Sequence, residues 1–420
     1  MIQFLLKGLR RDRSRSLFPL LVVAAGVFIV VFMQGWINGA ENSILGTNAT
    51  FFTGHVKVAT QAYHKESAIM TNELALTELG HLLQQLESMP MIWTPRIRFG
   101  GLIDIADHAG ETRSQTPFMC LAVSMAPTSR EHQILNLQQS LVRGRLPEAP
   151  GEILISEIMA NNLQVKPGEM ATLIGTTMNG SMSMRNFHIV GAINLGIVAL
   201  DRNMLIMEFR DAQEFLDMED AAGEILGFSP DLIFHEEKAR LIADQFNQGY
   251  DGADEFAPRM VTLPEQNDLE TMIKMMGLFS SVAVGIFVFA MSIVLWNAGL
   301  IGSLRRYNEF GIRMALGESK GHIYATLLCE SAFIGAVGTI LGTLLGLSVC
   351  YYLQVKGIDI SSMMRQSGVV MANVIRAKIT PATFVIGFIP GLAATQLGAM
   401  FSGLGIFRRQ TSELMKELEV

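Results

Sequence analysis

The sequence predicts an α-helical membrane protein with four transmembrane helices and a large α+β extracytoplasmic domain inserted between the first and second of them. Half of the 420 residues are hydrophobic and only 17% are charged, whereas soluble domains are about one quarter charged. Four long runs contain no Asp, Glu, Lys or Arg, and the chain between the first two runs has an ordinary density of charge. The composition is therefore an average over apolar spans and a water-soluble part.

The four uncharged runs hold 25 to 30 residues each: Ser16–Ala40, Met275–Leu304, Ser331–Val355 and Ile379–Phe407. A helix of about 20 apolar residues crosses the bilayer core, and a helix satisfies all of its backbone polar groups internally. We therefore predict transmembrane helices at residues 17–40, 275–302, 323–353 and 379–407. The rival interpretation, buried core helices of a soluble protein, is weakened by four independent runs of this length.

The first run also resembles a signal peptide, because a basic segment precedes an apolar one. Its apolar stretch, Leu17–Ile37, is longer than the roughly 7–15 residues usual in a signal peptide. We favour an uncleaved anchor, although Asn38-Gly39-Ala40 offers small residues to a peptidase.

Basic residues set the expected orientation, because the cytoplasmic flanks of spans are enriched in Lys and Arg. They gather before the first span, between the second and third, and after the fourth: Lys7, Arg10, Arg11, Arg13, Arg15, Arg305, Arg306, Arg313, Lys320, Arg408, Arg409 and Lys416. The loop 303–322, the tail 408–420 and both termini are therefore predicted to be cytoplasmic. The loop 354–378 is then outside, and its four basic residues run against the rule.

The insert between the first two spans, 41–270, is expected to fold as the outer α+β domain. Residues 38–270 contain 31 Asp and Glu against 15 Lys and Arg, and this acidic balance argues against nucleic-acid binding. Hydrophobic alternation predicts strands at Gly54–Ala59, Arg96–Ala106, Phe118–Val123, Glu152–Ser156, Ala171–Gly175, Phe187–Ile193 and Asn203–Glu208. Helical periodicity predicts helices at Glu73–Met89, Ser156–Leu163, Arg210–Met218 and Glu236–Asn247.

No motif for catalysis or metal binding stands out. The sequence has no G-x-x-x-x-G-K-[ST] phosphate loop, so ATP hydrolysis is not expected on this chain. Seven of the eight histidines are scattered over the insert without the spacing of metal ligands. The three cysteines, Cys120, Cys329 and Cys350, suit buried apolar positions. We expect no catalytic residue, no metal and no cofactor bound by this chain.

The most informative motif lies in the loop after the second span, which reads Arg305-Arg306-Tyr307-Asn308-Glu309-Phe310-Gly311-Ile312-Arg313-Met314-Ala315-Leu316-Gly317-Glu318-Ser319. This loop resembles that of the FtsX-like ABC transporter permeases, approximately E-x-G-x-x-R-A-L-G-A. Other stretches are similar to the family's outer domain and C-terminal ending: 144–156, 165–169, 187–191 and 407–415. The segment Leu5–Leu17 is similar to the family's basic amphipathic entry helix, which implies a cytoplasmic amphipathic helix over residues 1–16. The chain departs from the family at Met314, where Arg is frequent, and at Ser412, where Pro is usual.

The resemblance implies a membrane subunit of an ABC transporter in the bacterial inner membrane, with a MacB-like periplasmic domain. Family members act as dimers and transmit ATP-driven motion to that domain, while ATP and Mg are bound by a separate ATPase subunit. The motif positions that are implied to couple to the ATPase are Glu309, Gly311, Arg313, Ala315, Leu316 and Gly317. Without the resemblance, a solvated connector whose charges only fix topology remains an alternative.

Two features of the third span are candidates for function. Gly338, Gly342 and Gly346 lie at four-residue spacing, which permits close helix packing in lipid. Packing within one chain and dimerisation both fit, and the dimeric family favours an interface between protomers. Glu330 is an ionisable group at membrane depth and a possible functional carboxylate. Alternatively, it reaches the headgroups or pairs with an arginine.

Within the family we favour the lipoprotein-releasing branch (LolC/LolE-like), given the length, the lack of a fused ATPase and the segment Gly54-His55-Val56. An acyl chain would then lie in a groove lined by Phe28, Phe32, Trp36 and Phe289, unless these residues only face lipid or the bundle. The rivals are a MacB-like exporter of peptides or drugs and a non-transporting regulator of cell-wall hydrolases. Other expected partners are a second permease in a heterodimer, a periplasmic carrier or adaptor protein, and membrane lipids.

Overall fold

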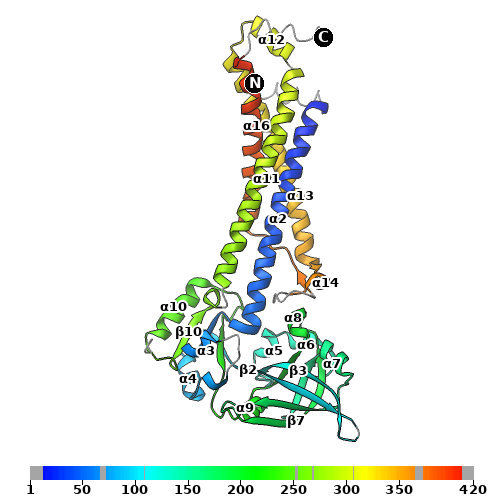
Figure 1. The fold of residues 1–420 in the computed structure, drawn as a ribbon. Helices are drawn as coiled ribbons and strands as arrows, with labels where there is room; N and C mark the ends of the chain where they lie inside the picture. Colours follow the sequence, from blue (N-terminus) through cyan, green and yellow to red (C-terminus); the bar gives the residue numbers. More distant parts are fainter. Residues whose placement is uncertain are drawn as a thin grey trace. The chain divides into compact units, whose positions relative to one another are not determined.

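The computed structural model describes residues 13–66, 72–107, 109–250, 254–266, 269–305, 307–364 and 372–408 (Figure 1). They form two compact units. The helical unit contains the described residues up to Asn42, Ile273–Ile358 and those from Ile375 onward, and the α/β unit contains Ser43–Met272 and Asp359–Val374. Most of the predicted N-terminal amphipathic helix and of the C-terminal tail, including Ser412, lies outside the described residues.

Within the described part of the chain, four helices are long and apolar enough to cross a membrane. They are α2 (Arg13–Asn48), α11 (Leu269–Arg305), α13 (Lys320–Lys356) and α16 (Phe388–Arg408), and they run along one another in Figure 1. A shorter helix, α12 (Tyr307–Ala315), lies between α11 and α13 in the chain. The number of candidate spans therefore agrees with the predicted four.

The second and third helices extend three to six residues beyond their predicted ends, and the first and fourth depart further from prediction. The first helix does not end at residue 40, because α2 continues to Asn48 and a π-helix, η1 (Ala49–Thr53), follows without a break. The fourth is two helices, α15 (Pro381–Val385) and α16. Pro390 explains this break: its ring would clash with a carbonyl four residues earlier in a continuous helix, but it fits the first turn of α16.

Small residues bring α13 and α16 close together. A Cβ atom on Gly335 would lie 2.4 Å from the Oγ1 atom of Thr395, and one on Gly391 would lie 2.0 Å from that of Thr339. At one point a glycine of α13 faces a threonine of α16, and at the other a threonine of α13 faces a glycine of α16. Such close approach matters in lipid, where packing replaces the hydrophobic drive between helices.

The α/β unit is built on a ten-stranded mixed sheet in the order β10-β1-β9-β2-β3-β8-β5-β7-β4, with β6 beside β2 and β7. The strands are β1 (Val56–Thr60), β2 (Ile92–Ala106), β3 (Thr112–Val123), β4 (Leu141–Gly144), β5 (Glu152–Ser156), β6 (Met170–Thr176), β7 (Met182–Ile193), β8 (Met204–Glu208), β9 (Glu224–Phe228) and β10 (Pro258–Thr262). A two-stranded pair, β11 (Ile358–Asp359) and β12 (Val374–Ile375), stands apart.

The long strand β2 belongs to both halves of this sheet. Its first residues, Ile92–Arg96, pair with β9, and Ile97–Ala106 pair with β3. One apolar cluster runs across both halves of the sheet, and a second lies on the half formed by β3, β8, β5 and β7. The helices of the unit are α3 (Gln61–Lys65), α4 (Leu79–Leu86), α5 (Glu131–Ile134), α6 (Leu137–Ser140), α7 (Glu157–Leu163), α8 (Val198–Asp201), α9 (Phe209–Leu216), α10 (Glu236–Asn247) and α14 (Ser361–Met364).

The predicted elements of this unit match the structure unevenly. Each predicted strand overlaps an observed one, and β5 and α10 have the predicted bounds. The predicted helix Glu73–Met89 is shorter, because Leu76 forms a bridge with Ala222 and α4 begins only at Leu79. Strands β4, β9 and β10 were not predicted, since each has at most five residues and no clear alternation.

Candidate functional site

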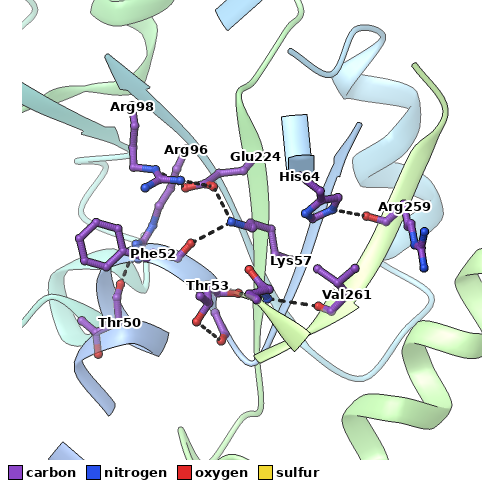
Figure 2. A network of polar contacts seen from close by, with 12 residues as sticks. Thr50, Phe52, Thr53, Lys57, His64, Arg96, Arg98, Glu224, Arg259 and Val261 are labelled. Carbon is purple, nitrogen blue, oxygen red and sulfur yellow. Dashed lines mark hydrogen bonds and ion pairs between the residues drawn. The ribbon is translucent and has the colours of Figure 1, made fainter. Parts of the chain in front are cut away.

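A buried ionic network surrounds the end of the first long helix within the α/β unit (Figure 2). Its charged members are at most 6% exposed: Lys57, Arg96, Arg98, Glu131 and Glu224. They come from β1, β2, α5 and β9, so four elements contribute to one site. Charges are rarely buried this completely unless they are paired.

Arg96 joins α5 to the end of the helix. Its Nε and Nη2 atoms each donate a 2.8 Å hydrogen bond to the Glu131 carboxylate. Its Nη1 atom donates to the Thr50 carbonyl at 2.6 Å. A bidentate arginine–carboxylate pair fixes the plane of the guanidinium, so the remaining nitrogen is held on the helix carbonyl.

Glu224 holds the other two cations. Arg98 Nη2 donates to its Oε2 atom at 2.9 Å, and Lys57 Nζ lies 3.4 Å from the same oxygen. Burial lowers the pKa of Lys57 and Glu224 opposes that shift. For Glu224, burial favours a higher pKa, but Arg98 and Lys57 bring it below its ordinary value. The carboxylate is thus ionised between two cations.

Three backbone carbonyls of η1 are bound from different elements. Besides Arg96 on Thr50, Lys57 Nζ donates to Phe52 O at 3.3 Å and Gln266 Nε2 donates to Thr53 O at 3.3 Å. The last carbonyls of a helix lack partners within it and carry partial negative charge. The two cations therefore cap this helix end.

The site also brings together the two chain segments that lead to the helical unit, one after the first helix and one before α11. Gln266 lies just before α11, and its contact with Thr53 brings the start of that connection to the end of the first helix. Gly54 completes the cap with a φ of +59° and a 2.9 Å backbone hydrogen bond to Ala49. The network is therefore a junction at which the end of the first helix is held against the sheet.

Two histidines near this junction are structural. His55 is 4% exposed, and its Nδ1 atom accepts a 3.0 Å hydrogen bond from the backbone N–H of Ser229. Burial lowers the pKa of His55 to about 4, and burial does the same for His64. Both rings are therefore neutral near pH 7. Among the described residues, no group of three or more His, Cys, Asp or Glu is arranged to hold a metal ion.

The predicted ATPase-coupling residues lie on α12 and directly after it. This helix follows α11 and precedes α13 in the chain. Gly311 is buried and Ala315 exposed, and Leu316 is 83% exposed. Arg313 Nε lies 3.1 Å from Glu318, and Gly317 turns the chain with a φ of +94°. Glu309 lies on α12 as well. The segment thus presents apolar surface beside a fixed turn.

The predicted glycine stripe faces α2 of the same chain. Cβ atoms on Gly338, Gly342 and Gly346 would each lie less than 3 Å from atoms of α2, notably Val23, Ala24 and Val31. The structure therefore covers, within the chain, a surface that we expected between protomers. Glu330 lies on α13 and is partly exposed.

Three of the four residues predicted to line a groove form a ladder on α2. The ring centroids of Phe28 and Phe32 are 6.2 Å apart, and those of Phe32 and Trp36 are 6.5 Å apart. Phe32 and Trp36 also pack beside Cys350. Phe289, on α11, is 68% exposed, and no ring contact between described residues joins it to the ladder.

The junction was not predicted from the sequence. Charged residues are normally exposed, and Arg98 and Glu224 are 126 positions apart. A usable signal was present, since Lys57 and Glu224 each sit in a short apolar run, Val56–Ala59 and Glu224–Phe228. A charge inside such a run indicates a buried ion pair.

Comparisons with known proteins support the FtsX/MacB-type family. Residues 281–411 match the family model "FtsX-like permease C-terminal". The chain is 28% identical over 129 residues to "Macrolide export ATP-binding/permease protein MacB" of Bordetella avium (strain 197N). That alignment covers 31% of the chain and only 18% of the relative.

One solved structure is a more distant neighbour. It is the crystal structure of the periplasmic region of MacB from Actinobacillus actinomycetemcomitans, which shares 10% sequence identity with this chain at a TM-score of 0.37. The match covers 54% of this chain and 95% of that one.

Proposed function

We propose that the chain is the membrane subunit of an ABC transporter in the bacterial inner membrane. A separate ATPase subunit binds ATP and Mg, and this chain works as a dimer with itself or with a second permease. The match of residues 281–411 to the FtsX-like permease model and the four apolar helices support this role. In this proposal both termini are cytoplasmic, and the large domain between the first two spans is periplasmic.

The observation that carries the proposal is the junction at the end of the first helix. One continuous helix, Leu17–Thr53, is long enough to span a membrane and then enters the α/β unit. Its last carbonyls are held by Arg96 and Lys57, whose charges are paired with buried carboxylates. Removing one partner of a buried ion pair costs about 3–5 kcal/mol. A helix fixed this firmly transmits movement of the span to the periplasmic sheet.

ATPase docking on the coupling segment (Tyr307–Gly317) gives the first test. The exposed side chain of Leu316 would be desolvated in such a contact, so Leu316→Asp would bury an unpaired carboxylate at a cost of several kcal/mol. Arg313→Glu would reverse a charge in the same contact. Both variants should insert into the membrane normally and lose the ATPase during purification in detergent.

Leu241→Asp is the matched control, because Leu241 is 69% exposed on α10 of the α/β unit. It should retain the ATPase. Wild-type stoichiometry of ATPase with both coupling-segment variants would refute docking there, whereas loss of the ATPase in the control as well would show a general defect.

We further propose that lipoproteins are the substrate and that their acyl chains leave the membrane sideways between protomers. The aromatic ladder Phe28–Phe32–Trp36 supports this, since a lipid anchor gains about 0.8 kcal/mol per buried CH₂. Photo-crosslinkers at Phe28, Phe32 and Phe289 should capture tagged lipoproteins only when these are acylated. Capture of phospholipid alone would favour the rival functions, a MacB-like exporter of peptides or drugs or a regulator of cell-wall hydrolases.

A further inference from the structure

The chain passes between the two units again in the connection from α13 to α15, residues 357–380. Within this connection, Asp359–Val374 belongs to the α/β unit, whereas Ile358 and Ile375 belong to the helical unit. The other two crossings follow Asn42 and Met272, on either side of the junction in the chain. The connection is therefore a second covalent route between the helical unit and the sheet.

Asn373 attaches this connection to the loop before α8 at two points. Its backbone N–H donates to the Gly196 carbonyl at 2.7 Å, and its Oδ1 atom accepts a 3.1 Å hydrogen bond from the Val198 N–H. Val198 is the first residue of α8, and Ile197 before it provides no side-chain cap. The first N–H groups of a helix need acceptors from outside the helix. Asn373 thus supplies one from 175 positions away in the chain.

The loop that Asn373 binds is itself firmly held. The Asp201 carboxylate is 3% exposed and accepts hydrogen bonds from the Leu195 and Ile197 N–H groups at 2.8 and 3.0 Å. Ile197 and Leu200 are buried in the apolar cluster that lies on β3, β8, β5 and β7. A displacement of Asn373 therefore acts on this half of the sheet, whereas the charged residues of the junction come from β1, β2, α5 and β9.

The chain after Asn373 reaches the helical unit without slack. There, the Lys378 N–H donates to the Gly35 carbonyl of α2 at 2.9 Å, and a Cβ on Gly39 would lie 2.2 Å from the Arg376 carbonyl oxygen. Only the two residues of β12 separate Asn373 from Arg376. A strand rises about 3.2–3.4 Å per residue, and a fully extended chain reaches at most about 3.6 Å. This short segment is therefore almost fully extended.

The chain before Asn373 is equally short. Helix α13 ends at Gly357, whose N–H donates to the Leu353 carbonyl at 2.8 Å. The two residues of β11 follow and pair with β12, and the next N–H, that of Ile360, donates to the Asn373 carbonyl at 2.8 Å. We call β11, Ile360, Asn373 and β12 the strap. Both chain segments of the strap thus meet at Asn373.

We propose that the strap is a second attachment of the α/β unit and that Asn373 is the positioning residue through which it acts. A body held at one point rotates freely about that point, and a second attachment restricts the rotation. With either the junction or the strap released, movement of the spans no longer sets the orientation of the sheet. The inference deepens the proposed function, on which the purpose of the strap rests, but the attachment itself requires no ATPase.

Three variants separate the side chain of Asn373 from the tightness of the strap. Asn373→Leu removes the acceptor for α8, and Asn373→Asp keeps one. In the slack variant, Gly-Ser-Gly-Ser is inserted after Gly357 and again after Ile375, so that the contacts of Asn373 remain and both segments lengthen. The matched control carries the same eight residues after Gly110, in the exposed turn between β2 and β3.

Hydrogen exchange of the Val198 amide in the full-length protein measures the attachment directly. Asn373→Leu should speed this exchange about fivefold, the usual effect of losing a helix cap. Asn373→Asp and the slack variant should exchange like the wild type, because both retain an acceptor for Val198. This measurement also shows that the slack variant keeps its local fold.

Double electron–electron resonance on the isolated chain in detergent measures the restriction of rotation. Spin labels at Val355 of α13 and Met184 of β7 are 63% and 61% exposed and lie one in each unit. The exposed Cys329 is replaced by serine, and labelled chains are diluted with unlabelled ones. Four flexible residues span about 10–12 Å, so the distance distribution of the slack variant should broaden by several ångströms. Asn373→Leu should broaden it as well.

Asn373→Asp and the control with the insertion after Gly110 should keep the width of the wild type. A wild-type width in the slack variant or in Asn373→Leu would overturn the proposal, as would equal broadening in the control. Unchanged exchange of Val198 in Asn373→Leu would also overturn it. None of these measurements uses an ATPase, so their failure leaves the proposed function standing, and failure of ATPase docking leaves their result valid.

Discussion

Two stretches of the same helix are held in opposite ways. Within the helical unit, Val23, Val27 and Val31 of α2 pack against glycines of α13 without any charge. Within the α/β unit, the end of that helix is held by Arg96 and Lys57. In lipid, backbone groups are satisfied inside the helix and only close packing is needed. Where a helix ends, its carbonyls need donors, so the chain supplies buried cations and their carboxylates.

The largest effect is expected from removing the shared carboxylate of the junction. Glu224→Ala leaves Lys57 and Arg98 buried without their carboxylate partner, which should lower the opening free energy of β9 by about 3–5 kcal/mol. Native-state hydrogen exchange of β9 in the full-length protein measures this. The double variant Lys57→Met with Glu224→Leu should recover part of the loss. Exchange unchanged in Glu224→Ala would show that the junction adds no strength.

A smaller effect is expected from breaking the glycine contact of α2. A Cβ on Gly342 would be 2.5 Å from the Ala24 carbonyl oxygen, so Gly342→Leu must push the helices apart. We expect a loss of about 1–3 kcal/mol in thermal unfolding in detergent. Gly285→Leu on α11 is the control, because nothing lies within 4 Å of a Cβ there. Equal melting temperatures for the two variants would contradict the contact.

The pH dependence of stability distinguishes the two stretches further, because the buried histidine His55 adjoins the junction. The folded-state pKa of His55 is about 4 against an ordinary value of 6.5, so the unfolded chain binds more protons between these values. Stability should therefore fall as the pH drops from 6.5 towards 4, by up to about 1.4 kcal/mol per pH unit for each such histidine. The folded-state pKa of His64 is also about 4, so His64 contributes a pH dependence of the same sign.

His55→Asn isolates one of these contributions. The variant keeps a side-chain acceptor for Ser229 but cannot titrate, so the slope of the opening free energy of β1 and β9 against pH should decrease by about half. Hydrogen exchange at several pH values, corrected for intrinsic rates, gives this slope. An unchanged slope would mean that His55 is protonated in the folded state.

The smallest effect is expected from an exposed ion pair of the same unit. Arg185 donates to Glu214 at 2.7 Å, yet their side chains are 44% and 64% exposed. Exposed pairs contribute about 0–1 kcal/mol. We therefore expect Glu214→Gln to change the opening free energy of β7 by less than about 1 kcal/mol. A loss as large as that of Glu224→Ala would show that pairing, and not burial, sets the strength of the junction.

The sequence predicted elements whose pattern is local. The uncharged runs gave the four long helices, and the periodicity of Glu236–Asn247 gave α10 with its bounds. The break before α16 was missed because Pro390 lies inside an otherwise uniform apolar run. The junction was missed because its partners are far apart in the chain: Arg96 and Glu131 are 35 positions apart, and Lys57 and Glu224 lie on strands that only the fold makes neighbours. Long-range pairing is not readable from periodicity.

We propose that ATP-driven movement of the spans reaches the α/β unit through the capped end of the first helix. It is tested by the distance between spin labels at Val355 and Met184, which are 63% and 61% exposed and lie one in each unit. Cys329, the exposed native cysteine, is replaced by serine, and labelled chains are diluted with unlabelled ones. In complexes with the ATPase, double electron–electron resonance should show different distance distributions without nucleotide and with ATP trapped. Arg96→Leu, which removes the hydrogen bond to Thr50, should keep the ATPase bound and active but abolish this difference. Identical distributions in the two nucleotide states of the wild type, or an undiminished difference in Arg96→Leu, would contradict the claim.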